Sequence, residues 1–358
     1  QLYKPGDVRI DSGYTIFYMS INIGSMLGFL VCGYLGEKVG WHWGFGAAGV
    51  GMTFGVLQYL FSKNSLGEAG KNPNLAPTED KSKYMNIFKY SAIAIFLLII
   101  SGFVGLWTVD PQLLNQLTVY LILIVAISYF IYLFFFAGLG NDEIENIKML
   151  LLLFFGAVLF WAGFDQGGSS LNLFAKDYTD LFIFGWEMPA TFLQVANPLM
   201  VVIFAPFFAA LWIYLGKKNL DPDTPQKFAL GCFLMAIGFL VIIFGVEAAM
   251  QNEKAGIQFL LITYLFHTLG ELCLSPVGLS ATAKYSPIRY RGQMMGIWFL
   301  SSSLAAGLAG LLASKSFEAG IASMPDLFMQ IIIALFVVGI LLLISNRFVK
   351  ATEIKEGN

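Results

Sequence analysis

About ten runs of apolar residues, each long enough to cross a lipid bilayer, follow one another along this 358-residue chain. A transmembrane helix needs about 20 such residues, because the hydrocarbon layer is about 30 Å thick. The chain is 57% hydrophobic and 12% charged, which excludes an ordinary soluble domain. We therefore predict an all-α, polytopic membrane protein. The expected spans are 14–36, 44–62, 89–109, 117–138, 147–166, 190–215, 228–249, 257–284, 292–315 and 326–348.

The basic residues predict how these spans are oriented. If every span crosses the membrane, all but four of the 21 Lys and Arg residues fall on the side that holds residue 1. Basic residues accumulate on the cytoplasmic side of membrane proteins. We therefore expect an integral membrane protein, in a bacterial inner (plasma) membrane, with both ends of the chain cytoplasmic. The four exceptions are Lys38, Lys176, Lys254 and Lys315.

Glu271 lies near the middle of the apolar run 257–284, where a carboxylate is costly. A buried salt bridge is the structural alternative, but no Lys or Arg is expected near mid-depth. His267 comes one turn earlier and is either part of a site or a packing residue. Pro276 is expected to interrupt the helix and free backbone carbonyls. Glu271 is therefore a candidate functional residue.

Asp165 is a second acidic residue next to an apolar run. It follows Trp161 by four residues, so both side chains should project from the same helix face. The pair Gly167-Gly168 follows closely, which leaves a second interpretation in which Asp165 is solvated at the helix end. The functional interpretation is favoured because intramembrane acids often serve transport or proton relays.

Four further residues in the spans are candidates for contacts with a ligand. Asn22 and Asn197 can hydrogen-bond either a neighbouring helix or a ligand, and Pro198 is expected to loosen the helix after Asn197. Trp298 lies deeper than an interfacial tryptophan would need, with Ser302 four residues later.

Several classes of function have little support. The net charge of −2 argues against a nucleic-acid partner. No nucleophile–base pair, metal-ligand cluster or phosphate-binding loop stands out, so we expect neither an enzyme nor a bound cofactor or metal.

A set of collinear motifs resembles one family, the proton-dependent oligopeptide transporters of the major facilitator superfamily. The resemblance covers nearly the whole chain. Its motifs are Phe17-Tyr18-Met19-Ser20-Ile21-Asn22-Ile23-Gly24-Ser25, Gly40 to Gly46, Phe160-Trp161 with Asp165-Gln166, Ala196-Asn197-Pro198-Leu199, Gly270-Glu271 with Ser275-Pro276, and Met295-Gly296-Ile297-Trp298.

The resemblance implies a major facilitator superfamily fold and a division into three parts. Residues 1–62 would be the last two helices of the N-terminal bundle. Residues 63–146 would form a cytoplasmic linker and two accessory transmembrane helices. Residues 147–358 would form the six-helix C-terminal bundle and a cytoplasmic tail. On this interpretation the chain is N-terminally truncated, and the first four helices of the same protein are missing partners.

The resemblance also implies roles for the candidate residues. Glu271, Asn22 and Asn197 would hold the amino end of a di- or tripeptide, while Trp161, Trp298 and Ser302 would shape the pockets for its side chains. Asp165 would pair with a Lys on the fourth helix, and Asp165 and Glu271 would take part in gating and proton coupling. The Glu-x-x-Glu-Arg motif of the first helix and that Lys are absent from this chain.

Three functional hypotheses follow. The first is proton-coupled symport of di- and tripeptides by alternating access, driven by the proton gradient without a cofactor. The second is symport of another solute, such as nitrate or an amino-acid derivative. The third is a non-transporting membrane fragment, in which neutralising Glu271 or Asp165 would change nothing. Glu271 favours the first, because a peptide ammonium needs a carboxylate partner.

Overall fold

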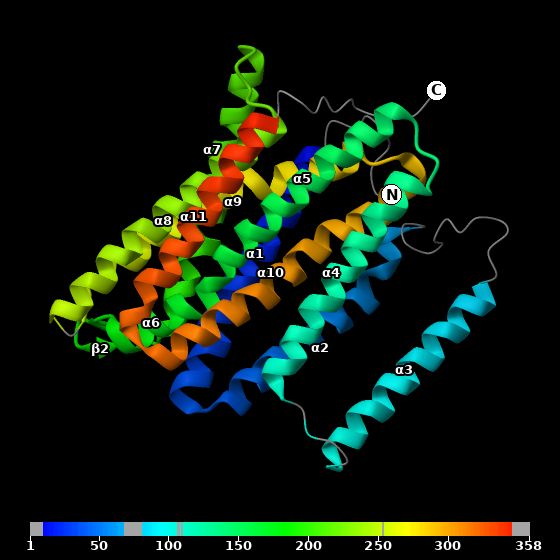
Figure 1. Ribbon diagram of the computed structural model, residues 1–358. Helices are drawn as coiled ribbons and strands as arrows, with labels where there is room; N and C mark the ends of the chain where they lie inside the picture. The colour runs from blue at the N-terminus through cyan, green and yellow to red at the C-terminus, as the bar shows by residue number, and fades with distance from the viewer. Residues whose placement is uncertain (1–9, 68–80, 106–107, 109, 253, 346–358) are drawn as a thin grey trace.

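The computed structural model describes residues 10–67, 81–105, 108, 110–252 and 254–345, which are almost entirely helical (Figure 1). Within this described part, ten helices are long and apolar enough to cross a membrane, and each overlaps one of the ten expected spans. The prediction of an all-α polytopic membrane protein is therefore confirmed. The middle of the expected linker (68–80) and the expected C-terminal tail (346–358) lie outside the described residues.

The first two helices are joined more tightly than the sequence suggested. Helix α1 (Ile10–Tyr34) runs into a π-helical turn, η1 (Leu35–Val39), and α2 (Trp41–Ser62) begins after a single residue. That residue is Gly40, at φ +148°, a backbone conformation that side-chain-bearing residues rarely adopt. The loop expected between residues 36 and 44 is thus mostly helical. The short 3₁₀ helix η2 (Lys63–Leu66) ends the segment.

Helices α3 (Lys81–Phe103) and α4 (Pro111–Phe135) follow. Helix α3 stands apart from the packed helices, and its residues from Met85 to Ile100 are all exposed (Figure 1). In a bilayer this apolar surface can face lipid, since every backbone group of a helix is bonded internally. Helix α4 instead packs along α10 (Arg291–Ala319).

The next segment has the least regular structure. Helix α5 (Asn141–Phe164) is followed by the 3₁₀ turn η3 (Asp165–Gly168) and the short helix α6 (Ser170–Tyr178). A small hairpin of β1 (Phe182–Ile183) and β2 (Trp186–Glu187) leads to the 3₁₀ helix η4 (Ala190–Val195).

Four more long helices complete the bundle, namely α7 (Ala196–Lys217), α8 (Thr224–Asn252), α9 (Gln258–Tyr285) and α11 (Met324–Ser345). The turns η5 (Ile288–Tyr290) and η6 (Ile321–Ser323) flank α10. The expected interruption at Pro276 was wrong, because α9 continues through it. Proline removes one hydrogen bond, but packing against neighbouring helices can hold a membrane helix together across the gap.

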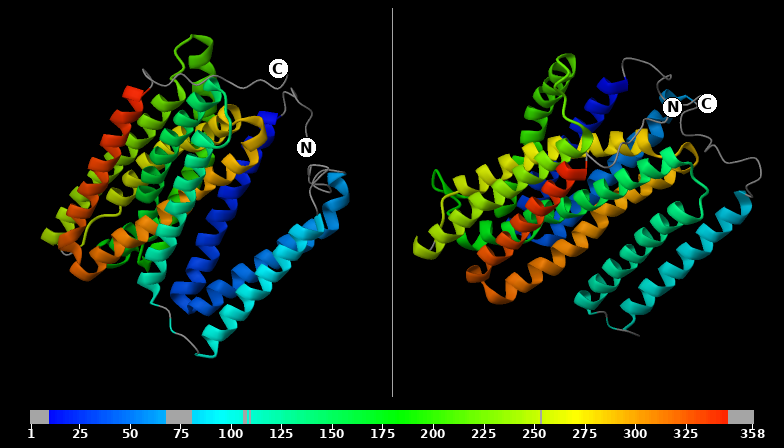
Figure 2. Two further views of the ribbon diagram at one scale, coloured as in Figure 1. Left: turned by 45° about the vertical axis from the view of Figure 1, so that its right-hand side comes forward. Right: turned by 45° about the horizontal axis from the view of Figure 1, so that its top comes forward.

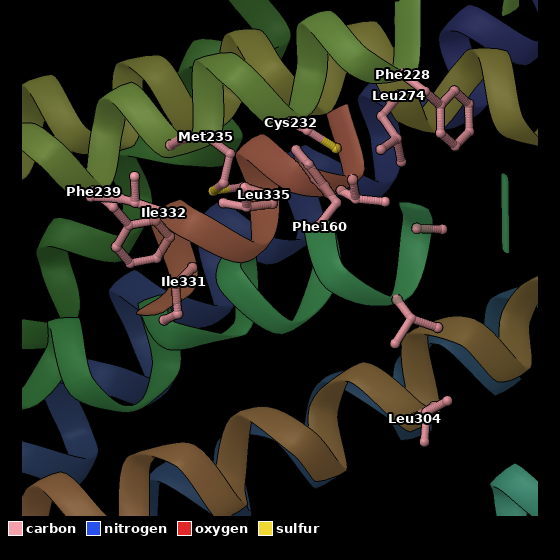
Figure 3. Packing of buried hydrophobic residues seen from close by; sticks show 14 of the residues in the cluster. Phe160, Phe228, Cys232, Met235, Phe239, Leu274, Leu304, Ile331, Ile332 and Leu335 are labelled. Carbon is pink, nitrogen blue, oxygen red and sulfur yellow. The ribbon is translucent and has the colours of Figure 1, made fainter. Parts of the chain in front are cut away.

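The core lies where α5, α8, α9 and α11 meet, and Figure 3 shows side chains from all four helices converging there. Helix α8 packs against both α9 and α11, and α7 covers α9 from the side. Figure 2 shows the same helices from two further directions. The side chains labelled in Figure 3 are all apolar, and all but Leu304 of α10 come from α5, α8, α9 and α11: Phe160, Phe228, Cys232, Met235, Phe239, Leu274, Leu304, Ile331, Ile332 and Leu335.

One acidic side chain connects the α1–α2 turn to the segment before α7. The carboxylate of Glu37, in η1, accepts hydrogen bonds from the backbone N–H groups of Ala190 (3.1 Å) and Thr191 (3.0 Å). These N–H groups belong to the first turn of η4 and have no partner within that helix. Helix α1 comes so close here that a Cβ at Gly33 would lie 2.5 Å from the Thr191 Oγ1. Glu37 therefore fastens η4 to the first helix pair.

We expect Glu37→Ala to lower the melting temperature of the detergent-purified protein. It leaves two partly buried N–H groups without an acceptor, and hydrogen bonds to charged groups are each worth about 1.5–3 kcal/mol. Glu187→Gln is a matched control, because it removes only an exposed ion pair with Lys38 at 3.4 Å, of the kind that contributes little. Unchanged melting of Glu37→Ala would contradict the role given to this carboxylate.

Candidate functional site

The structure brings two of the predicted residues into direct contact. The Asn197 Nδ2 donates a hydrogen bond to the Glu271 Oε2 at 2.9 Å, although the two residues lie 74 positions apart. Glu271 is the fourteenth of the 28 residues of α9 and is only 6% exposed. Asn197 and Pro198 both lie in the first turn of α7. The N–H groups of a first turn have no partner within the helix, so the N–H that Pro198 lacks does not loosen the helix there. The result is a carboxylate–amide pair in which the carboxylate is buried at the middle of α9 and the amide is partly buried at the start of α7.

Asn22 lies on the inner side of α1. Its side chain is 8% exposed, while its neighbours Ile21 and Ile23 are 49% and 42% exposed. Helix α1 packs against α7, the helix that carries Asn197. In a membrane helix, polar side chains are expected to face the inside of the protein and apolar ones the lipid. Asn22 and its two neighbours follow this pattern.

The two tryptophans occupy different surroundings. Trp298 is buried in α10, edge-on to Phe228 with ring centroids 6.1 Å apart, and a side chain at Gly278 would overlap its ring. Trp161 in α5 is partly exposed and packs edge-on against Phe164 at 5.1 Å. Ser302 is partly exposed one turn after Trp298. Their role in shaping side-chain pockets stays a prediction.

Asp165 is half-buried in the 3₁₀ turn that follows α5. The expected span ended at residue 166, and α5 ends two residues earlier, at Phe164, because Gly167 and Gly168 favour leaving the helix. Within the described residues, no Lys or Arg side chain forms an ion pair with Asp165.

Gln166 holds this turn in place, a role that the sequence did not reveal. Its side chain is fully buried and donates to the backbone carbonyls of Ala162 and Ala309, at 3.3 and 3.4 Å. Its Oε1 accepts hydrogen bonds from the hydroxyls of Ser169 and Ser170. Since Ala309 lies in α10, the turn that carries Asp165 is fastened to that helix.

Glu271 contacts α7, whereas His267, one turn earlier in α9, faces α8. Its ring packs against Phe239 of α8 with centroids 4.7 Å apart, and a Cβ at Gly238 would lie 2.5 Å from its Cδ2. His267 therefore belongs to the contact between α8 and α9, as the packing interpretation expected.

Comparison with known proteins identifies this arrangement. The family model PTR2, described as the POT family, matches residues 1–325. The chain belongs to the POT family. Among POT proteins, the peptide transporter YePEPT of Yersinia enterocolitica is 35% identical over 351 residues, which are 96% of this chain and 69% of the relative. The di-/tripeptide transporter of Lactococcus lactis subsp. cremoris is 30% identical over 317 residues, 86% of this chain and 63% of the relative.

A solved POT structure has the same fold. The crystal structure of a peptide transporter POT in complex with sulfate superimposes with a TM-score of 0.84 at 35% identity. The superposition covers 97% of this chain and 70% of that one. The chain therefore has the fold of the POT transporters in the major facilitator superfamily, over somewhat more than two thirds of the length of that neighbour. It is an integral membrane protein.

Proposed function

We propose that the intact protein containing this chain is a proton-coupled symporter of di- and tripeptides that works by alternating access. In this proposal the chain supplies the C-terminal bundle and the side of the site that holds the amino end of the peptide. Membership of the POT family and the names of the two relatives support a peptide substrate. Because those relatives are longer than this chain, the activity is proposed for the intact protein, including any helices that precede residue 1.

The observation that carries the proposal is the hydrogen bond between Asn197 and the buried carboxylate of Glu271. A carboxylate held away from water is costly unless charged or polar groups compensate it. A peptide ammonium would supply a positive charge and three N–H donors to this carboxylate. In the proposed site Asn22 and Asn197 add amide oxygens, and Trp161, Trp298 and Ser302 contact the side chains of the peptide.

Proton coupling is assigned to Asp165 and Glu271, and the proton gradient replaces any cofactor as the energy source. Asp165 lies on a turn that Gln166 connects to α10, so a change in the charge of Asp165 can be transmitted to that helix. The protein is accordingly a transporter rather than an enzyme.

We further propose that both ends of the chain are cytoplasmic in a bacterial inner membrane. The positive-inside rule supports this orientation. It assigns the side of Lys63, Lys148, Lys217 and Lys284 to the cytoplasm and the side of Lys38 and Lys176 to the outside.

The test is uptake by the intact protein reconstituted in liposomes. With an inward proton gradient, a radiolabelled dipeptide should accumulate, and a protonophore should abolish the accumulation. Uptake of nitrate or of an amino-acid derivative without dipeptide uptake would replace the peptide assignment with the second hypothesis. Absence of uptake of all three would contradict the transporter proposal.

A further inference from the structure

Thr268 makes two hydrogen bonds that connect the candidate site to its own helix. Its hydroxyl donates to the backbone carbonyl of Tyr264 at 2.7 Å and accepts from the Asn197 Nδ2 at 2.9 Å. The residue is fully buried in α9. It lies three positions before Glu271, so both side chains lie on the same face of the helix.

The bond to Tyr264 determines what Thr268 can offer to Asn197. A hydroxyl has one proton, and here that proton is directed at the Tyr264 carbonyl. Only oxygen lone pairs then face Asn197, and lone pairs attract an N–H group and repel an amide oxygen. Thr268 therefore determines that the Asn197 amide turns its nitrogen, and not its oxygen, toward the hydroxyl. The shape of the amide alone does not distinguish these two orientations, because its oxygen and nitrogen are nearly the same size.

This orientation leaves one amide atom for a ligand. Both N–H groups of Asn197 are committed, one to Thr268 and one to Glu271. The amide oxygen is then the remaining hydrogen-bonding atom, and no donor within the described residues is bonded to it. An ammonium group is a pure donor, so an oxygen is the atom that it requires. A reversed amide would instead present two N–H groups to the positive charge.

We propose that Thr268 is a positioning residue for the substrate's amino terminus, which acts by holding the oxygen of Asn197 toward the ammonium. The inference rests on the proposed function of the site. Glu271 favours the same amide orientation only while it is ionised, since a protonated carboxyl group can also donate. Thr268 has no such dependence and keeps the amide in place through a cycle in which Glu271 changes its charge.

A purely structural role for the hydroxyl is the competing explanation, and α9 contains a matched control for it. Thr282 is also buried and also donates to the carbonyl four residues earlier, that of Gly278, at 2.9 Å. Its hydroxyl accepts no hydrogen bond in the part of the chain that the structure describes, although its backbone carbonyl accepts one from the Ser286 hydroxyl. Thr282→Val therefore removes the same helix bond without touching Asn197.

The experiment compares Thr268→Val, Thr268→Ser and Thr282→Val in the reconstituted intact protein. Thr268→Val should raise the KM for a dipeptide about tenfold with little change in the maximal rate, the size expected for one lost hydrogen bond to a charged ligand. Thr268→Ser, which keeps the hydroxyl, and Thr282→Val should both stay near the wild-type KM. Inhibition by an N-acetylated dipeptide, which lacks the ammonium, should be unchanged in all three variants.

Two outcomes would overturn the inference while leaving the proposed function intact. One is a wild-type KM for Thr268→Val, and the other is an equal rise in KM for Thr268→Val and Thr282→Val. If Thr268→Val does not accumulate in the membrane, Thr268→Ala replaces it, since alanine cannot clash with its neighbours. Failure of the wild-type protein to transport any dipeptide would instead reject the proposed function, and with it the role of Thr268.

Discussion

Glu271→Gln should reduce proton-driven dipeptide uptake to background while the protein stays folded. The substitution removes the negative charge that is proposed to face the peptide ammonium. Loss of one partner from a buried, hydrogen-bonded charge pair costs about 2–5 kcal/mol, which weakens binding at least about 30-fold. Glu271 is also assigned to proton coupling, and glutamine cannot take up or release a proton. Both effects act in the same direction.

The fold should survive this substitution because the neutral side chain can keep the contact with α7. The Gln Oε1 atom has the position and lone pairs to accept the hydrogen bond that Asn197 now donates to the carboxylate. The melting temperature and the yield of the purified protein check this expectation directly.

Glu247→Gln is the matched control, since Glu247 is an exposed acid on the neighbouring helix α8. It should transport like the wild type. If Glu271→Gln accumulated dipeptide at the wild-type rate under a proton gradient, Glu271 could be neither the ammonium partner nor a coupling residue.

The number and order of the transmembrane helices could be predicted because hydropathy is a local property of the sequence. The ends of the helices could not. Helix α5 begins at Asn141, six residues before the predicted start, because charged residues remain helical there. Asp142 and Glu143 lie in its first turn, and the Glu143 carboxylate accepts from the Gly140 N–H at 3.0 Å. Acidic residues are favoured in the first turn of a helix. The point where the sequence changes from polar to apolar therefore did not mark the start of α5.

Local rules did not settle the course of the helix at Pro276 or at Asp165. The expected break at Pro276 applied the rule that proline interrupts a helix, and at Asp165 the sequence left open whether the residue lies within the span or at the helix end. Pro276 is held in a continuous helix packed between α7 and α8, where tertiary contacts outweigh the lost bond. At Asp165 the helix ends, and the buried side chain of Gln166 stabilises the turn through a carbonyl of α10.

The residues of the candidate site could be selected from their types and depth, but their contacts could not. Asn197 and Glu271 are joined because α7 packs on α9, and no sequence pattern spans that distance along the chain. Thr268 looks like any threonine of an apolar helix until its two hydrogen-bond partners are known. Glu37 looks like a loop residue, although its carboxylate binds two N–H groups more than 150 positions away. Pairings of this kind arise from packing.

Asp165→Asn should impair gradient-driven uptake more than peptide exchange. Asparagine has nearly the same shape as aspartate, so the turn and its connection through Gln166 should persist, but it cannot gain or lose a proton. Coupling between two sites typically changes an equilibrium about 5- to 150-fold, and we expect accumulation under a proton gradient to fall about tenfold. Exchange of internal for external peptide requires only binding and the conformational change, and should fall less than about twofold.

The two activities are measured in the same liposomes, with and without a proton gradient, so differences in reconstitution cancel. Asp177→Asn controls for the loss of a nearby negative charge, because Asp177 is an exposed residue of α6. Equal loss of uptake and exchange in Asp165→Asn would mean that Asp165 supports the fold or the conformational change itself rather than the coupling. A selective loss of uptake would identify the half-buried turn after α5 as the place where the proton acts, separate from the Asn197–Glu271 pair that is proposed to bind the peptide.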